Sequence, residues 1–116
     1  MAQLEGLLIV LNDQSKIDPL LKTFLANDVR GCTILDSEGM THHIVAEDKD
    51  ENHFQALRAL IKNSPSHSKT LLVAASEGEI QRVVKLALEV IGDINKPDTG
   101  FMMTFPIDNV YGLMKK

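Results

Sequence analysis

The residues best suited to chemistry gather in one polar stretch. They are His42, His43, Glu47, Asp48, Asp50 and His53. Imidazole and carboxylate side chains ligate Zn, Cu, Ni or Co. Adjacent histidines on an extended strand point to opposite sides, so one chain is not expected to hold a single ion with both. A symmetric assembly could bring one histidine from each copy together, which makes His42 and His43 candidate metal ligands; a solvated polar loop is the alternative.

A catalytic role finds less support. Cys32 is the only cysteine, and a thiol on a strand is expected to be a small buried group rather than an activated nucleophile. Asp36, Ser37 and His42 have the residue types of a hydrolytic triad, but nothing in their spacing fixes a triad geometry. We therefore assign no catalytic residues and do not expect an enzyme.

Length and charge exclude several classes of protein. With 116 residues, the chain has the size of a single domain spanning residues 1–116. Its 16 acidic and 12 basic residues give a formal net charge of −4, which provides no electrostatic basis for binding nucleic acid. The longest apolar run, Leu7–Leu11, is far shorter than the roughly 20 residues of a membrane helix. The N-terminus lacks a signal-peptide pattern and a lone cysteine cannot form an internal disulfide, so we expect a cytoplasmic protein.

Hydrophobic patterning predicts the elements that must position these side chains. Short apolar runs predict strands, and apolar residues at helical spacing predict helices. We expect strands at 4–11, 32–35, 70–75 and 100–105, long helices from 17 to about 27 and from 77 to 91, and a short helix at 54–61. Ser76 followed three residues later by Glu79 is a capping box for the second long helix. The polar segment 38–53 carries no sustained period and is expected to be an irregular loop.

The order of these elements predicts an α+β fold, a ferredoxin-like split βαβ sandwich (strand, helix, strand, short helix, strand, helix, strand). Both long helices then cover one face of the sheet, although the strands are apolar on both faces. Burying one such side chain is worth about 1.5–3 kcal/mol, so the second face needs a cover. Further copies of the chain in a closed symmetric assembly are the expected cover, and the alternative is that residues 54–61 fold back over it.

Four segments carry a resemblance to a known family. They are Val29–Thr33, Leu35–Met40, Lys96–Gly100 and Thr104–Gly112. In this order and spacing the chain resembles the PII-like proteins, relatives of the nitrogen regulatory protein PII, over nearly its whole length. The resemblance implies a homotrimer that binds a small effector between subunits. It also implies that the T-loop-equivalent segment 38–53 controls a partner protein, a transporter or an enzyme.

In that family an adenine nucleotide lies between the T-loop base and B-loop of one subunit and the Gly-x-Thr segment of the next. The matching positions here are Gly31, Cys32, Thr33, Gly39, Met40, Thr99, Gly100 and Phe101. Glycine lets backbone N–H groups approach an anion, and a threonine hydroxyl can bond a purine edge. Turn geometry alone is the alternative role for the glycines.

The chain departs from the family where phosphates are held. A lysine and two arginines of the family correspond to Phe101, Gly112 and Met114, and Lys96, Lys115 and Lys116 could replace them only in part. AMP, ADP, cyclic AMP or a non-nucleotide anion therefore becomes more plausible than ATP, and no cofactor is required. The alternative function is a trimeric metal-binding protein (Zn, Cu, Ni or Co), similar to the divalent-cation-tolerance proteins, without a nucleotide.

Overall fold

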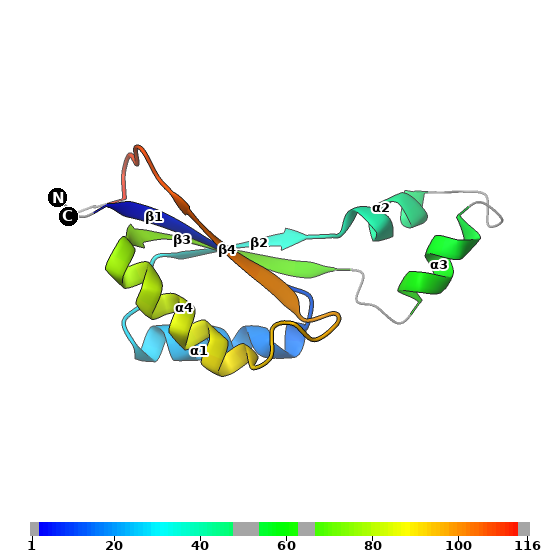
Figure 1. Cartoon of the computed structure of the whole chain (residues 1–116), viewed down its shortest axis with the longest axis horizontal. Helices are drawn as coiled ribbons and strands as arrows, with labels where there is room; N and C mark the ends of the chain where they lie inside the picture. The colour runs from blue at the N-terminus through cyan, green and yellow to red at the C-terminus, as the bar shows by residue number, and fades with distance from the viewer. Residues whose placement is uncertain (1–2, 48–53, 63–66, 114–116) are drawn as a thin grey trace.

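The sheet has four strands in the order β2-β3-β1-β4, seen in a computed structural model that describes residues 3–47, 54–62 and 67–113 (Figure 1). The strands are β1 (Leu4–Leu11), β2 (Cys32–Ser37), β3 (Ser68–Ser76) and β4 (Gly100–Pro106). Every neighbouring pair is antiparallel. β1 and β2 therefore run parallel to each other with β3 between them, which is the predicted split βαβ arrangement.

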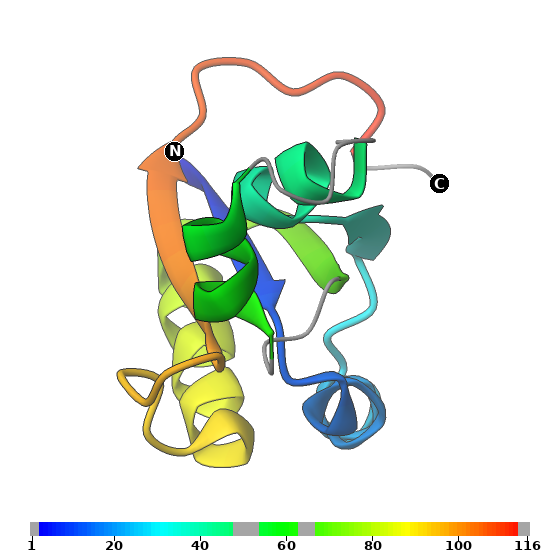
Figure 2. The ribbon, with the colours of Figure 1, turned by 90° about the vertical axis from the view of Figure 1, so that its right-hand side faces the viewer.

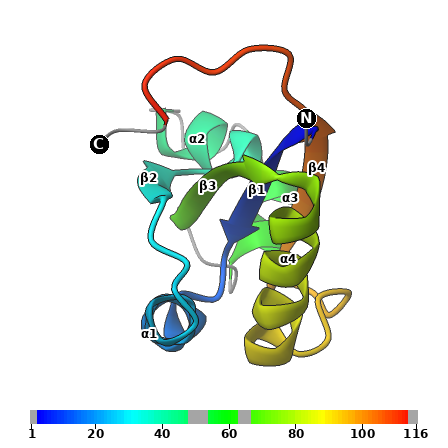
Figure 3. The same ribbon diagram turned by 90° about the vertical axis from the view of Figure 1, so that its left-hand side faces the viewer.

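The two long helices cover one face of this sheet. A short 3-10 turn, η1 (Gln14–Lys16), leads into α1 (Ile17–Ala26), and α4 (Glu77–Ile91) follows β3. Figures 1 and 3 show α1 and α4 side by side below the sheet. The largest fully buried side chains lie in this layer: Leu7, Ile9, Leu11, Leu20, Phe24, Leu71, Ile80 and Val83. Leu25, near the end of α1, is exposed.

Helix α4 begins and ends where the sequence predicts. The Ser76 hydroxyl accepts a hydrogen bond from the Glu79 N–H at 3.4 Å, which satisfies one free donor of the first turn. Only this half of the capping box forms, because the Glu79 carboxylate binds Arg82 one turn later. At the other end Gly92 has φ 80°, a conformation that glycine adopts without strain, and its N–H donates to the Leu88 carbonyl.

The described part of the segment predicted to be an irregular loop is largely helical, since Met40–Glu47 form α2, so that prediction was wrong. The short helix predicted at 54–61 is confirmed as α3 (Gln55–Ile61). Residues 48–53 lie outside the described part of the chain. Helix α2 contains good helix formers such as Met40, Ala46 and Glu47, and it packs against α3, from which the Arg58 guanidinium donates to the Val45 carbonyl at 3.5 Å. Because this contact joins residues that are distant in sequence, it produces no apolar period within α2 that the sequence could show.

Strand β2 is longer than predicted, and it carries α2 and α3 away from the sheet. The strand continues through Asp36 and Ser37 because Lys69 and Ser68 of β3 bond their side chains. Figures 1 and 2 show α2 and α3 beyond the ends of β2 and β3. The molecule is therefore elongated, measuring 56 × 28 × 22 Å. The alternative in which residues 54–61 cover the second sheet face is wrong.

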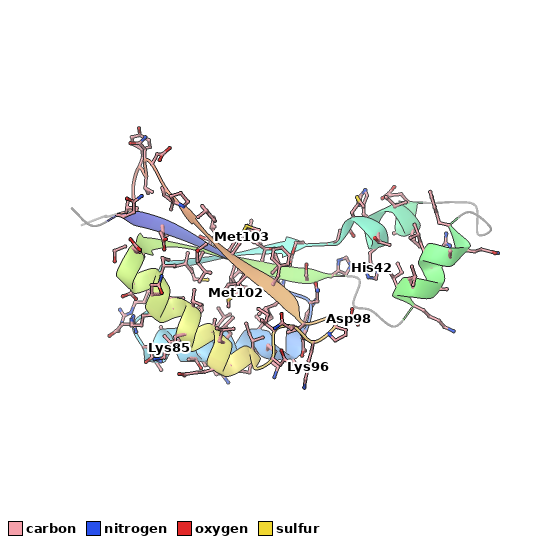
Figure 4. The ribbon with its side chains drawn as sticks, in the orientation of Figure 1. His42, Lys85, Lys96, Asp98, Met102 and Met103 are labelled. Atoms are coloured by element: carbon pink, nitrogen blue, oxygen red, sulfur yellow. The ribbon has the colours of Figure 1, made fainter. Side chains whose placement is uncertain are left out.

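The second face of the sheet, here called the outer face, is uncovered and apolar. Alternation along the paired strands places these side chains on it: Leu8, Val10, Leu35, Leu72, Phe101, Met103 and Phe105. Phe101 and Met103 are each 48% exposed and Leu72 is 38% exposed. Figure 4 shows Met103 and Met102 pointing to opposite sides of β4. No helix within the described ranges is long and apolar enough to cross a membrane.

Candidate functional site

A hollow lined by both polar and apolar side chains lies on the outer face where β2 leads into α2. Its volume is about 360 Å³, and it is called hollow A. It is lined by Val10, Asn12, Ser37, Glu38, Gly39, Ser68, Thr70 and Phe101. Two predicted ligand-binding residues, Gly39 and Phe101, are therefore brought together from positions far apart in the sequence.

Three hydroxyl groups form the floor of hollow A. The Ser37 hydroxyl lies 2.7 Å from that of Ser68 and 2.8 Å from that of Thr70. Ser37 is the register partner of Ser68, and Thr70 lies two residues further along the same face of β3. Sequence reasoning missed this cluster, because its members are ordinary strand residues that only the pairing of β2 with β3 unites.

The loop before β4 fixes the position of Phe101. The Thr99 carbonyl accepts hydrogen bonds from the Asn12 and Asp13 N–H groups, at 2.9 and 3.4 Å. Gly100 has φ +139°, and a Cβ built on it would lie 2.0 Å from the Val10 carbonyl oxygen. Thr99 and Gly100 therefore join the loop to β1 and place the half-exposed ring of Phe101 beside hollow A. Met40, the first residue of α2, is exposed and is not among the residues that line the hollow.

The other three predicted ligand-binding residues lie at the opposite end of β2. Gly31 lines a second cavity of about 780 Å³, called hollow B, with Leu4, Ala74, Ala75, Ser76, Glu79, Val110, Gly112 and Leu113. Figure 3 shows the segment after β4 crossing this end of the sheet. Cys32 is partly buried, and burial raises the pKa of its thiol. Thr33 is exposed beside Leu72 on the outer face.

The predicted ligand-binding residues thus fall into two separate groups. Cys32 and Ser37 lie five residues apart on β2, which corresponds to about 17 Å at ~3.3 Å per residue. Hollow A and hollow B are consequently not parts of one pocket within a single chain. They can meet at one ligand only if two copies of the chain each contribute one of them.

The two histidines occupy the first turn of α2 rather than an extended strand, so the strand geometry assumed for them was wrong. The His43 Nδ1 atom forms a hydrogen bond with the Glu38 carboxylate. The backbone N–H of His43 donates to the Gly39 carbonyl at 3.0 Å. Among the residues that the structure describes, no three His, Cys, Asp or Glu side chains are close enough to hold a metal ion. His53, Asp48 and Asp50 lie outside that part of the chain.

The ion pair at the base of α2 predicts an altered titration of His43. The hydrogen bond and charge of Glu38 raise the pKa of His43 above its ordinary value of about 6.5. We expect a side-chain NMR titration to give a higher pKa for His43 in the intact chain than in Glu38→Gln. Glu47→Gln, a change of the same kind at the far end of α2, should retain most of the elevation.

The same pair makes stability depend on pH in a defined direction. Folding raises the pKa of His43. The contribution of the His43–Glu38 pair to the free energy of unfolding is therefore complete at pH values below the His43 pKa of the unfolded chain, and it is lost as pH rises through the pKa of the folded chain. The free energy of unfolding, measured by urea denaturation, should therefore differ between Glu38→Gln and the unsubstituted chain by more at pH 5.5 than at pH 8.5. An equal difference at both pH values would contradict the pairing.

Asp36 and Ser37 have no triad geometry. Asp36 is paired with Lys69, which lowers the pKa of the carboxyl, and Ser37 bonds two other hydroxyls. The positions that correspond to the phosphate-binding residues of the resembled family are only partly described. Phe101 borders hollow A and Gly112 borders hollow B, whereas Met114, Lys115 and Lys116 lie outside the described residues.

Comparison with known proteins identifies the fold. No protein-family model matches the sequence, and no curated protein matches it. Among solved structures, Arabidopsis thaliana PII bound to citrate is similar with a TM-score of 0.62 and 10% identity, over 91% of this chain and 78% of that one. B. subtilis GlnK is similar with a TM-score of 0.62 and 13% identity, over 94% and 89% of the two chains.

A protein of unknown function from Pediococcus pentosaceus has a TM-score of 0.61 and 13% identity, over 96% of this chain and 98% of that one. At these identities the likeness concerns the fold. The chain is structurally similar to PII proteins over most of its length, as its sequence predicted.

Proposed function

We propose that this protein is a PII-like regulator, not an enzyme, that binds an adenine nucleotide between the subunits of a homotrimer. The observation that carries the proposal is the division of the predicted ligand-binding residues between hollow A and hollow B. Each hollow lies at one end of an uncovered apolar face. Contact between outer faces of neighbouring copies would bring hollow A of one copy to hollow B of the next.

The outer face supports assembly by its composition. Leu8 and Leu72 are cross-strand partners at its centre, and Met103 is the other partner of Leu8. An apolar patch that spans several strands is costly in water and marks an interaction surface. A closed ring of identical copies covers such a patch on every subunit.

The position of hollow A also supports a switching role for the segment 38–53. Glu38 and Gly39 line the hollow, and α2 begins at the next residue. A ligand there would contact the base of the projecting helices directly. Because an effector shifts a conformational equilibrium only through different interactions with its two states, such contact is what regulation of a partner transporter or enzyme requires.

Mixed assemblies test the proposal. Phe101→Ala removes the ring at hollow A, and Gly31→Leu fills hollow B, where a Cβ meets no atom within 4 Å. Each variant alone should bind AMP, ADP, ATP and cyclic AMP at least about tenfold more weakly in titration calorimetry. After joint unfolding and refolding of equal amounts, random trimers should recover about one quarter of the sites, because an intact site needs a native half from each neighbour.

The matched control is Gly78→Leu, since Gly78 also has no atom within 4 Å of a built Cβ and does not itself line either hollow, although its neighbour Glu79 lines hollow B. It should bind as the unsubstituted chain does. Failure of the mixture to recover any binding would contradict a site shared between copies. Heat from Zn or Cu that disappears in His42→Ala or His43→Ala, without heat from any nucleotide, would favour the metal-binding alternative.

A further inference from the structure

The charges around hollow A are unlike those of a polyphosphate site. Among its described lining residues there is one carboxylate, Glu38, and no lysine or arginine. Lys69 lies between Ser68 and Thr70 in sequence, but alternation along β3 turns it to the other face, where it pairs with Asp36. The cation nearest in sequence to the hydroxyl cluster is therefore both turned away and neutralised.

Within the part of the chain that the structure describes, the adjoining half of the proposed site adds no net positive charge. Arg30, next to Gly31, is paired with Asp28 at 3.2 Å. Arg82 is paired with Glu79, which itself lines hollow B. Each of these arginines thus has a carboxylate beside it, and phosphate oxygens would have to displace that carboxylate or approach it.

Hollow A instead offers groups that suit an uncharged ligand. The Phe101 ring is 48% exposed and provides a surface on which a planar base can stack. The Ser37, Ser68 and Thr70 hydroxyls can each donate and accept hydrogen bonds. The Glu38 carboxylate accepts hydrogen bonds from amino or sugar hydroxyl groups but repels an anion.

We infer that the site selects an adenine ligand with at most one negative charge, such as adenosine or cyclic AMP, over ADP and ATP. This inference rests on the proposed function and specifies its effector. The selectivity follows from three features: the Glu38 carboxylate in hollow A, whose charge is offset by its partner His43 only when that imidazole is protonated; the paired arginines near hollow B; and the stacking surface of Phe101.

Titration calorimetry on the full chain tests the inference, with adenosine, cyclic AMP, ADP and ATP at one ionic strength. The buffer is set above the His43 pKa measured by the NMR titration, so that the neutral imidazole does not offset the charge of Glu38. ATP is expected to bind at least about tenfold more weakly than adenosine. Glu38→Gln should reduce this ratio to about threefold or less, and Phe101→Lys should bind ATP about tenfold more tightly than Phe101→Ala, which lacks the ring but adds no charge.

Glu47→Gln is the matched control, because it removes the same charge from the exposed end of α2 outside the hollow. It should leave the ratio of adenosine to ATP affinity unchanged. ATP binding more tightly than adenosine to the unsubstituted chain would overturn this inference and leave the proposed function standing. Absence of binding by every adenine compound would overturn both.

Discussion

Replacing Gly100 with alanine is expected to lower the free energy of unfolding by at least about 3 kcal/mol. The added Cβ would lie 2.0 Å from the Val10 carbonyl oxygen and 3.1 Å from the Leu11 Cα, both of which are backbone atoms of β1. The φ of +139° adds strain for any residue with a side chain. β4 must therefore move away from β1 or the chain must unfold, and urea denaturation followed by circular dichroism measures the loss.

Two other glycines provide controls, since a Cβ built on either meets nothing within 4 Å. Gly31→Ala should change stability by less than about 0.5 kcal/mol. Gly78→Ala, inside α4, should increase it by about 0.5–1 kcal/mol, because alanine has the higher helix propensity. A Gly100→Ala protein as stable as Gly31→Ala would show that β4 does not approach β1 as closely as described. It also follows that a loss of ligand binding in Gly100→Ala would not by itself identify a ligand contact.

Replacing Leu72 with glutamate is expected to convert the proposed trimer to monomers. Leu72 lies at the centre of the outer face between Leu8 and Thr33, and its 38% exposure lets a single chain tolerate a charged side chain there. In the assembly three such charges would be buried without partners, which costs several kcal/mol for each. Since about 1.4 kcal/mol is tenfold in an equilibrium constant, association should weaken by well over 100-fold.

Light scattering coupled to size-exclusion chromatography measures this change directly. The unsubstituted chain should have the mass of three copies of the 12.8 kDa subunit, and Leu72→Glu the mass of one. Leu25→Glu is the control, because Leu25 is exposed on α1, on the opposite side of the molecule. A monomeric unsubstituted chain would contradict the trimer and, with it, any site shared between hollows A and B.

The regular elements could be predicted because their signals are local. The apolar run Leu4–Leu11, the Ser76 cap and the terminal Gly92 all act within a few residues of themselves, and the structure confirms the elements that they mark. Helix α2 could not be predicted in this way. Its residues show no helical apolar stripe. It packs against α3, which follows it in the sequence after residues 48–53, a stretch outside the described part of the chain.

The candidate site shows the same division. The family resemblance named Gly39 and Phe101, and the structure places both at hollow A. It did not indicate Ser68 or Thr70, because a serine or threonine on a strand has no distinctive pattern until the register gives it a partner. The resemblance also could not distinguish the roles of Gly31 and Gly100. Gly100 is required because the backbone of β1 approaches it closely, whereas Gly31 borders open space.

By itself, the sequence determined the split βαβ order and the presence of more apolar strand surface than two helices can cover, because burial preference and helix capping are properties of nearby residues. Only the tertiary structure decided which side chains share a hollow. Strand register and the direction of the β2–β3 ribbon place Ser37 beside Thr70, send α2 and α3 away from the sheet, and turn Lys69 from the hydroxyl cluster. These are long-range relations, set by backbone hydrogen bonds between residues that lie 31 (Ser37 and Ser68) to 41 (Cys32 and Val73) positions apart.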